Sequence, residues 1–497
     1  MKTLLINLLY IFCIVMLSTQ NTTGQSFINS SHAKMAHSPG LDGSLVLLNL
    51  AGEQPDHIQK IFTAAFNALS VNSQVSFADL AYNDQFVQLC KSNGMFLTGG
   101  PMLGNITSDG VKIWVRTLFP AKVEVHVNVD GADKKFGPVS STKESDLTVV
   151  INISGLKAGT QYPYQFFVDG KPVNLDVKTF FTTLPPEGQA GKTNIVFGSC
   201  YHRWGLSNAK LAKQIEAEKP LAFLINGDIA VQDRNNNIAM HRADYLLRDM
   251  HPAWKNLVSM IPVYTTWDDH DYFDNDLWNI PEGYTQKDKE AVCKIFRTSW
   301  NNPSYGIKGD NGGVFFRTRI GPADVIMLDN RYFREKGNFL GDEQMKWFEK
   351  QLLDCKGPFI ILSNGTMWSD YVTNGKDSWG EFDPESREKI FNIIEKNKIG
   401  GVLLISGDRH GARGFTIPRP SGFNFYEFEA GCLGGRVGPH PISADWTTQL
   451  FGISGQSAFG EFTFNTTLAD PEVTFRLIHE SGHVFYKITL TRSQLTP

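Results

Sequence analysis

The chain has 497 residues, and at roughly 150 residues per domain this length allows about three domains. It carries 47 Lys and Arg against 51 Asp and Glu, a net charge of −4, which argues against nucleic acid as the main partner. With 41% hydrophobic and 20% charged residues the composition is globular, and it excludes a disordered chain, a collagen-like chain and a multi-span membrane protein.

Residues 1–24 have the features of a secretory signal peptide, in which Lys2 precedes an apolar run from Leu4 to Leu17. A membrane anchor is the alternative, but the run is shorter than the roughly 20 residues that a span needs. We therefore expect an exported protein, periplasmic or secreted, with no integral membrane segment after signal removal. One of the 6 cysteines, Cys13, lies in the signal, so an odd number remains and at least one thiol stays without a disulfide.

Residues 25–94 are predicted to form a helical extension. Apolar side chains recur there at helical spacing, at Ile58, Ile61, Phe62, Ala65 and Leu69. Ser76, followed three residues later by Asp79, marks a further helix start.

Residues 95–186 are predicted to form an all-β domain similar to immunoglobulin and fibronectin domains. Valines alternate with polar residues from 123 to 129, and aromatic residues alternate from Tyr162 to Phe166. The segment from Leu156 to Tyr162 resembles the corner of such a sandwich, where a tyrosine hydroxyl ties a strand to a loop. A linker is expected from Leu184 to Gly188.

Residues 190–490 alternate between strand and helix patterns, which predicts an α/β sheet with helices on its faces. The expected strands are 193–198, 221–226, 261–266, 323–328, 358–362 and 401–406. The expected helices are 207–218, 241–258, 342–354 and 385–397.

Each of these strands is followed by a polar cluster. The clusters are Gly198-Ser199-Cys200-Tyr201-His202, Gly227-Asp228, Trp267-Asp268-Asp269-His270-Asp271 with Asp274-Asn275-Asp276, Asp329-Asn330-Arg331, Ser363-Asn364-Gly365 and Gly407-Asp408-Arg409-His410. Ligands bind at this edge of open α/β sheets. Because carboxylates gathered there would repel one another, the clusters predict bound cations, with Asp228 suited to bridge two ions about 4 Å apart.

These motifs resemble, in order and spacing, those of PhoD-like alkaline phosphatases in the calcineurin-like metallophosphoesterase superfamily, and the preceding β region is similar as well. The resemblance covers roughly residues 95–490 and implies a metallophosphoesterase α/β sandwich. It implies these metal ligands: Cys200, Asp228, Asn275, Asp408 and His410, with Asp269 as a further ligand or an acceptor behind the ligands. It also implies that His270 protonates the leaving group or binds phosphate, with Asp271 orienting its imidazole.

One position departs from the family pattern. Val231 stands where family members often carry a tyrosine that binds iron, three residues after Asp228. Two or more metal ions are expected, and iron, calcium, manganese and zinc all remain open.

Substrate contacts are predicted for Arg331 and Asn364. An arginine fork suits phosphate, with a salt bridge to the acidic cluster as the alternative. Asn364 has a simple turn with Gly365 as its alternative. His202, His241, His440, His479 and His483 receive no assignment.

The predicted activity is hydrolysis of small-molecule phosphate esters by metal-activated hydroxide, with His270 assisting the leaving group. A phosphodiesterase or phospholipase-type hydrolase on the same site is the first alternative. A non-catalytic surface-binding protein is the second, and it leaves the strand-end carboxylates unexplained.

Overall fold

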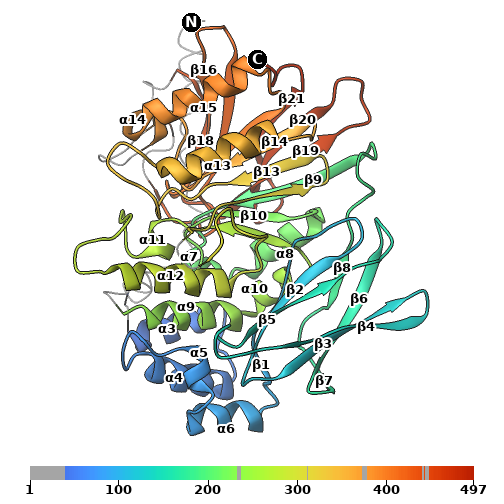
Figure 1. The fold of residues 1–497 in the computed structure, drawn as a ribbon, viewed down its shortest axis with the longest axis vertical. Coiled ribbons are helices and arrows are strands. Elements are labelled where there is room, and N and C mark those ends of the chain that lie inside the picture. The colour runs from blue at the N-terminus through green and yellow to red at the C-terminus, as the bar shows by residue number, and fades with distance from the viewer. Residues whose placement is uncertain are drawn as a thin grey trace, which may run out of the picture.

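The computed structural model describes residues 38, 40–231, 237–309, 312–371, 378–438, 442 and 447–497 (Figure 1). The predicted signal peptide, residues 1–24, lies outside the described residues. Among the described helices, none combines the length and the apolar character needed to cross a membrane.

Four helices form the first described part of the chain, drawn in blue in Figure 1. They are α3 (Leu41–Leu48), α4 (Asp56–Leu69), α5 (Phe77–Leu80) and α6 (Asp84–Ser92). The stripe predicted for α4 is buried at Ile61, Phe62 and Leu69. Ser76 caps α5, since its hydroxyl accepts from the N–H of Asp79 in a capping box, as the sequence predicted.

Residues 97–182 carry eight strands. They are β1 (Leu97–Gly104), β2 (Val111–Thr117), β3 (Lys122–Val129), β4 (Ala132–Ser140), β5 (Thr148–Ile153), β6 (Gln161–Val168), β7 (Lys171–Val173) and β8 (Phe180–Thr182). One sheet has the order β1-β2-β5 and the other the order β4-β3-β6-β7, with β8 beside β6. The N–H of Lys157 donates to the hydroxyl of Tyr162 at 3.0 Å, the strand-to-loop tie that the sequence predicted.

Two larger mixed sheets form the α/β part of the molecule. The six-stranded sheet has the order β11-β10-β9-β19-β20-β21, and the seven-stranded sheet has the order β12-β13-β14-β15-β17-β16-β18. The strands of the first are β9 (Lys192–Gly198), β10 (Phe223–Asn226), β11 (Val263–Thr266), β19 (Ala458–Asn465), β20 (Glu472–His479) and β21 (Val484–Thr491). Those of the second are β12 (Phe316–Ile320), β13 (Ala323–Met327), β14 (Phe359–Ser363), β15 (Val402–Ser406), β16 (Ala412–Pro418), β17 (Asn424–Ala430) and β18 (Gln449–Ile453).

All six predicted strands are present, but they do not belong to one sheet. Strands β9, β10 and β11 run parallel in one sheet, and β13, β14 and β15 run parallel in the other. The two sheets pack face to face, since Phe428 of β17 stacks on Phe475 of β20 with ring centroids 4.3 Å apart. The strand–helix alternation by itself suggested one sheet, which is wrong, because later antiparallel strands complete two sheets. Two packed sheets agree with the α/β sandwich that the family resemblance implied.

Helices cover the outer faces of both sheets (Figure 1). Near the six-stranded sheet lie α7 (His202–Gly205), α8 (Ala209–Glu218), α9 (Ala239–Met250), α10 (Pro252–Val258), α11 (Asp269–Tyr272) and α12 (Gln286–Ser299). Near the seven-stranded sheet lie α13 (Gly341–Leu353), α14 (Trp379–Phe382) and α15 (Pro384–Lys396). Along β14, Ile360 and Leu362 pack toward these helices, whereas Phe359 and Ile361 face the core between the sheets.

The helix predicted over 241–258 is two helices. Pro252 begins α10, and His251 before it is extended, with φ −71° and ψ 119°. A residue that precedes proline disfavours the helical conformation, so α9 ends at Met250.

Candidate metal centre

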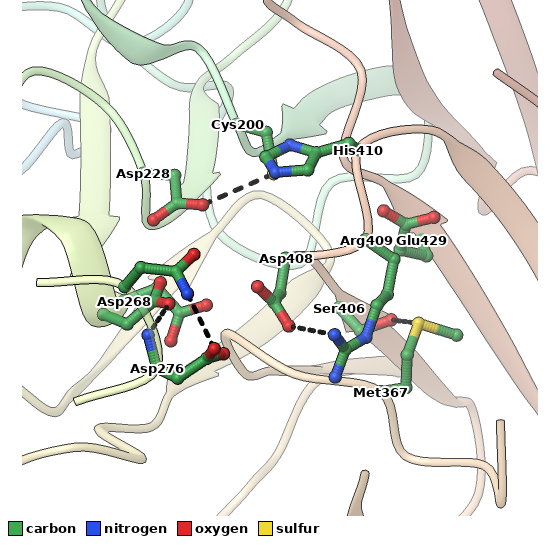
Figure 2. Close-up of polar contacts among 12 residues, drawn as sticks. Cys200, Asp228, Asp268, Asp276, Met367, Ser406, Asp408, Arg409, His410 and Glu429 are labelled. Carbon is green, nitrogen blue, oxygen red and sulfur yellow. Dashed lines mark hydrogen bonds and ion pairs between the residues drawn. The ribbon is translucent and has the colours of Figure 1, made fainter. Parts of the chain in front are cut away.

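The carboxyl ends of strands from both sheets bring their polar clusters together. Cys200 follows β9, Asp228 follows β10, Asp268 and Asp269 follow β11, and Asp408 follows β15. Figure 2 shows the carboxylates of Asp228, Asp268 and Asp408 facing a common space beside Cys200 and His410. Three overlapping groups have ligand atoms within 4.8 Å of one another: Cys200, His202 and His410; His202, Asp228 and His270; and Asp228, Asp268, Asp269 and Asp408.

The backbone adopts an uncommon conformation at the strand ends. The residues with positive φ here are Cys200 (55°), His202 (50°), Asp228 (56°), Asp408 (75°) and His410 (43°). Left-handed backbone is sparsely populated by residues other than glycine, and such conformations gather at functional sites. Gly227 precedes Asp228 with φ 87°, and a Cβ there would lie 2.5 Å from the Cβ of Asp268, so only glycine fits the turn.

The four carboxylates form an oxygen-rich group that is only partly compensated, since Arg331 pairs with Asp268 and Arg409 pairs with Asp408 at 3.1 Å. Among the described residues, Oδ1 of Asp228 and Oδ2 of Asp268 are buried without a hydrogen-bond partner. Burial, followed by the charge of Asp269, raises the pKa of Asp228. Burial raises the pKa of Asp268 to about 7, even though Arg331 opposes the shift. Buried acceptors of one charge sign are costly unless a cation joins them, so this donor set fits a metal ion.

A second group offers sulfur and nitrogen. The Sγ atom of Cys200 lies 3.6 Å from Oδ2 of Asp228, and Nε2 of His202 lies 3.3 Å from Nδ1 of His410. Burial, then the charge of Asp228, raises the pKa of the Cys200 thiol. Burial, then the charge of Arg436, lowers the pKa of His410, which keeps its imidazole neutral. No disulfide links the five cysteines of the described residues, so Cys200 is available as a ligand.

His270 lies beside the donors, whereas Asp271 is directed at the backbone. The His270 and His202 rings lie with centroids 5.5 Å apart. The Asp271 carboxylate accepts from the N–H of Ile229 at 3.2 Å and from that of Ala230 at 3.4 Å. These bonds fix the loop after Asp228, and the predicted orientation of His270 by Asp271 stays a prediction.

The predicted substrate residues differ in their surroundings. Arg331 is buried, and its Nε donates to Oδ1 of Asp268 at 2.5 Å, which is the salt-bridge alternative. Asn364 is buried at the end of β14, and within the described chain its amide group has no hydrogen-bond partner. The neighbouring Asn330 is in the same state. The Asn364 side chain therefore offers uncommitted polar atoms at the site edge, and the Arg331 guanidinium is already engaged by a carboxylate.

Comparisons with known proteins identify the family of this chain. A family model described as PhoD-like phosphatase matches residues 225–489, more than half of the chain. The chain belongs to the PhoD-like phosphatase family. A second model, described as a domain of unknown function (DUF7800), matches residues 95–185.

One curated protein matches part of the sequence, and two solved structures share the fold. Alkaline phosphatase D of Bacillus subtilis (strain 168) is 24% identical over 218 residues, which cover 37% of this chain and 35% of that relative, so the match spans about a third of its length. The structure of PhoD superposes with a TM-score of 0.66 at 18% identity, covering 80% of this chain and 91% of that one. Purple acid phosphatase PPD1 from yellow lupin (Lupinus luteus) seeds gives a TM-score of 0.61 at 16% identity, covering 79% and 75%.

Two positions of this family member differ from the predicted ligand set. The side chain of Asn275 is exposed, and its amide donates to Oδ2 of Asp276 at 2.6 Å, so its role as a ligand stays a prediction. His202, which the sequence left unassigned, is buried among the donors. The sequence spacing could have indicated His202 as a ligand, because His202 follows Cys200 by two residues, as His410 follows Asp408.

Proposed function

We propose that this protein is an exported metal-dependent phosphoesterase that hydrolyses small-molecule phosphate esters. The observation that carries the proposal is the group of four carboxylates from Asp228, Asp268, Asp269 and Asp408, because two of them hold buried oxygens without a hydrogen-bond partner among the described residues, as a bound cation would require. The proposed ligands are Cys200, Asp228, Asp269, Asn275, Asp408 and His410, and Asp268, which is paired with Arg331, adds negative charge beside them.

The bound ions would supply hydroxide at neutral pH and neutralise the phosphoryl oxygens. Asp228 belongs both to a group with histidines and to the group of carboxylates, which supports a bridging role. His270, whose ring lies beside these donors, would give a proton to the leaving oxygen. Asn364 would orient the substrate through its uncommitted amide, whereas Arg331 would act mainly by holding Asp268.

The proposal includes an order of parts along the chain. Residues 1–24 would direct export, 25–94 would form a helical extension, 95–186 an immunoglobulin- or fibronectin-like domain, and 190–490 the catalytic domain. The two sheets within 97–182 and the hydrogen bond between Lys157 and Tyr162 support the immunoglobulin- or fibronectin-like domain.

Elemental analysis combined with a substrate panel tests the function. The full chain, purified without chelator, should hold at least one ion per molecule and release phosphate from an aryl or alkyl monoester. A preference for diesters would indicate the phosphodiesterase or phospholipase alternative. Less than one ion per chain and no hydrolysis of either class would contradict the proposal and favour a non-catalytic binding protein.

A further inference from the structure

We infer that His202 is a metal ligand and completes, with Cys200, Asp228 and His410, a four-coordinate site for a borderline-soft divalent ion such as Zn²⁺ or Co²⁺. The inference rests on the proposed function, because it assigns a donor to the same centre.

Two interatomic distances match those of opposite edges of a tetrahedron. With metal–nitrogen bonds of about 2.0–2.1 Å, two ligand nitrogens of a tetrahedral ion lie about 3.3 Å apart. The His202 Nε2 and His410 Nδ1 atoms lie 3.3 Å apart. A thiolate at about 2.3 Å and a carboxylate oxygen at about 2.1 Å from the same ion lie about 3.6 Å apart. The Cys200 Sγ and Asp228 Oδ2 atoms lie 3.6 Å apart.

Membership of overlapping groups links these two pairs. His202 shares one group with Cys200 and His410, and a second with Asp228 and His270. A hydrogen bond between the two imidazoles accounts for their contact alone. It does not account for the Cys200 thiol that lies 3.6 Å from the Asp228 carboxylate, a contact that an ion shared with the two imidazoles would explain.

The His202 imidazole is held in place before any ion binds. Its ring stacks on Trp204 with centroids 4.4 Å apart, and its backbone N–H donates to the carbonyl of Asp228 at 2.8 Å. Preorganised side chains of this kind are typical of metal ligands, because ordering them on binding would weaken affinity.

The backbone at His202 supports the same assignment independently. His202 has the left-handed conformation found at Cys200, Asp228, Asp408 and His410, all of them predicted ligands. Turns of this form aim side chains from strand ends into one space, at a cost in local strain.

The donor types decide the class of ion. One sulfur, two imidazole nitrogens and one carboxylate oxygen suit Zn²⁺, Co²⁺ or Fe²⁺ rather than Ca²⁺ or Mg²⁺, which prefer oxygen alone. Val231 is buried and apolar, so it adds no donor. Asp268, Asp269 and Asp408 provide the oxygen-only environment for a different ion.

Co²⁺ titration of the metal-stripped full chain tests the inference, because tetrahedral Co²⁺ bound by thiolate has intense visible and near-ultraviolet absorption. We expect the wild-type chain to develop these bands at one Co²⁺ per molecule. His202→Gln should bind Co²⁺ at least about 100-fold more weakly and lose the tetrahedral intensity, since replacing a ligand costs more than the 10–100-fold typical of the groups that support ligands. His251→Gln is the matched control, because His251 is equally buried but lies at the start of α10.

A second variant protects the test against a folding defect in His202→Gln. His202→Cys keeps a donor at this position, so it should bind Co²⁺ and gain thiolate-to-metal charge-transfer intensity over the wild type. Wild-type Co²⁺ affinity and spectrum in His202→Gln, or no gained intensity in a Co²⁺-loaded His202→Cys, would overturn the inference and leave the proposed function standing. No bound Co²⁺, Zn²⁺ or other ion in the wild-type chain would overturn both.

Discussion

At the scale of single residues, Asp228 and His270 have separable roles. Asp228 is buried and contributes to two groups of donors, whereas His270 contributes to one. A change at Asp228 therefore affects every ion held at the strand ends, and a change at His270 affects chemistry more than ion content.

Asp228→Asn should lose metal and activity together. His270→Ala should keep most of its metal and lose activity by about 100- to 10,000-fold, the usual contribution of general acid catalysis. The loss should be smaller for an aryl phosphate, whose leaving group needs little protonation, than for an alkyl phosphate. Steady-state rates on both substrates, with metal content measured on the same samples, check the two roles.

The comparison of the aryl with the alkyl phosphate serves as the control for His270→Ala. Equal losses on both would rule out the acid role of His270 and favour phosphate binding. Wild-type metal content in Asp228→Asn would contradict the bridging role of Asp228.

The sequence reveals some site residues and hides others for a physical reason. Cys200 and Asp228 each follow a buried strand of the same sheet by two residues, so their convergence is predictable from parallel strands alone, whereas Asp408 follows β15 of the other sheet. His202 begins the short helix α7, and the left-handed backbone at Cys200 and at His202 is not encoded by a strand or helix pattern. The engagement of Arg331 by Asp268, 63 positions earlier, depends on tertiary packing that no local pattern encodes.

At the scale of elements, Asp249 in α9 links this helix to β2 and α12 through two arginines. Its carboxylate accepts from Nε of Arg248 at 2.8 Å and lies 3.5 Å from Nη1 of Arg116 in β2. Both guanidinium groups also bond to Ser299 of α12. Burial lowers the pKa of Arg116 to about 10, so this arginine stays charged and needs its carboxylate.

Asp249→Ala should destabilise the protein by about 3–5 kcal/mol, because it leaves two buried guanidinium groups without their counter-charge. The urea midpoint of tryptophan fluorescence measures this, since Arg248 lies over the ring of buried Trp300. Asp56→Ala is the control: its partner Lys60 is 61% exposed, and exposed pairs contribute little. Equal midpoint shifts in the two variants would show that the buried ion pairs of Asp249 contribute no more to stability than an exposed pair does.

The positions of strands and helices were predictable where a pattern within the segment itself determines them. The six parallel strands and the helices near 342–354 and 385–397 agree with α13, α15 and their neighbours, because apolar periodicity is a local property. The division into two sheets was implied by the family resemblance but by no local pattern, since it depends on β9 pairing with β19, where Phe197 meets Gly460 more than 260 positions later.

At the scale of the whole molecule, large apolar cores hold the fold independently of the metal centre. One core fills the space between the two sheets, and others lie under the helices on each side. Removal of metal by a chelator should therefore leave the far-ultraviolet circular dichroism nearly unchanged while hydrolysis stops. The thermal midpoint should still respond, because ions that bind the folded state stabilise it.

The size of that response should depend on pH. Burial raises the pKa of Asp268 to about 7 and also raises that of Asp228 in the metal-free chain. A carboxyl whose pKa is raised by folding stabilises the folded chain fully below its unfolded value of about 4, and this contribution is lost as pH rises through the folded value. Ions bind the ionised carboxylates, so the affinity of the carboxylates for ions rises over the same pH interval.

The difference in thermal midpoint between metal-loaded and stripped protein should therefore grow between about pH 5 and pH 8. Calorimetry at a series of pH values measures it, and Asp268→Asn should show a smaller growth. A difference that stays constant across this range would mean that the buried carboxylates do not hold the ions.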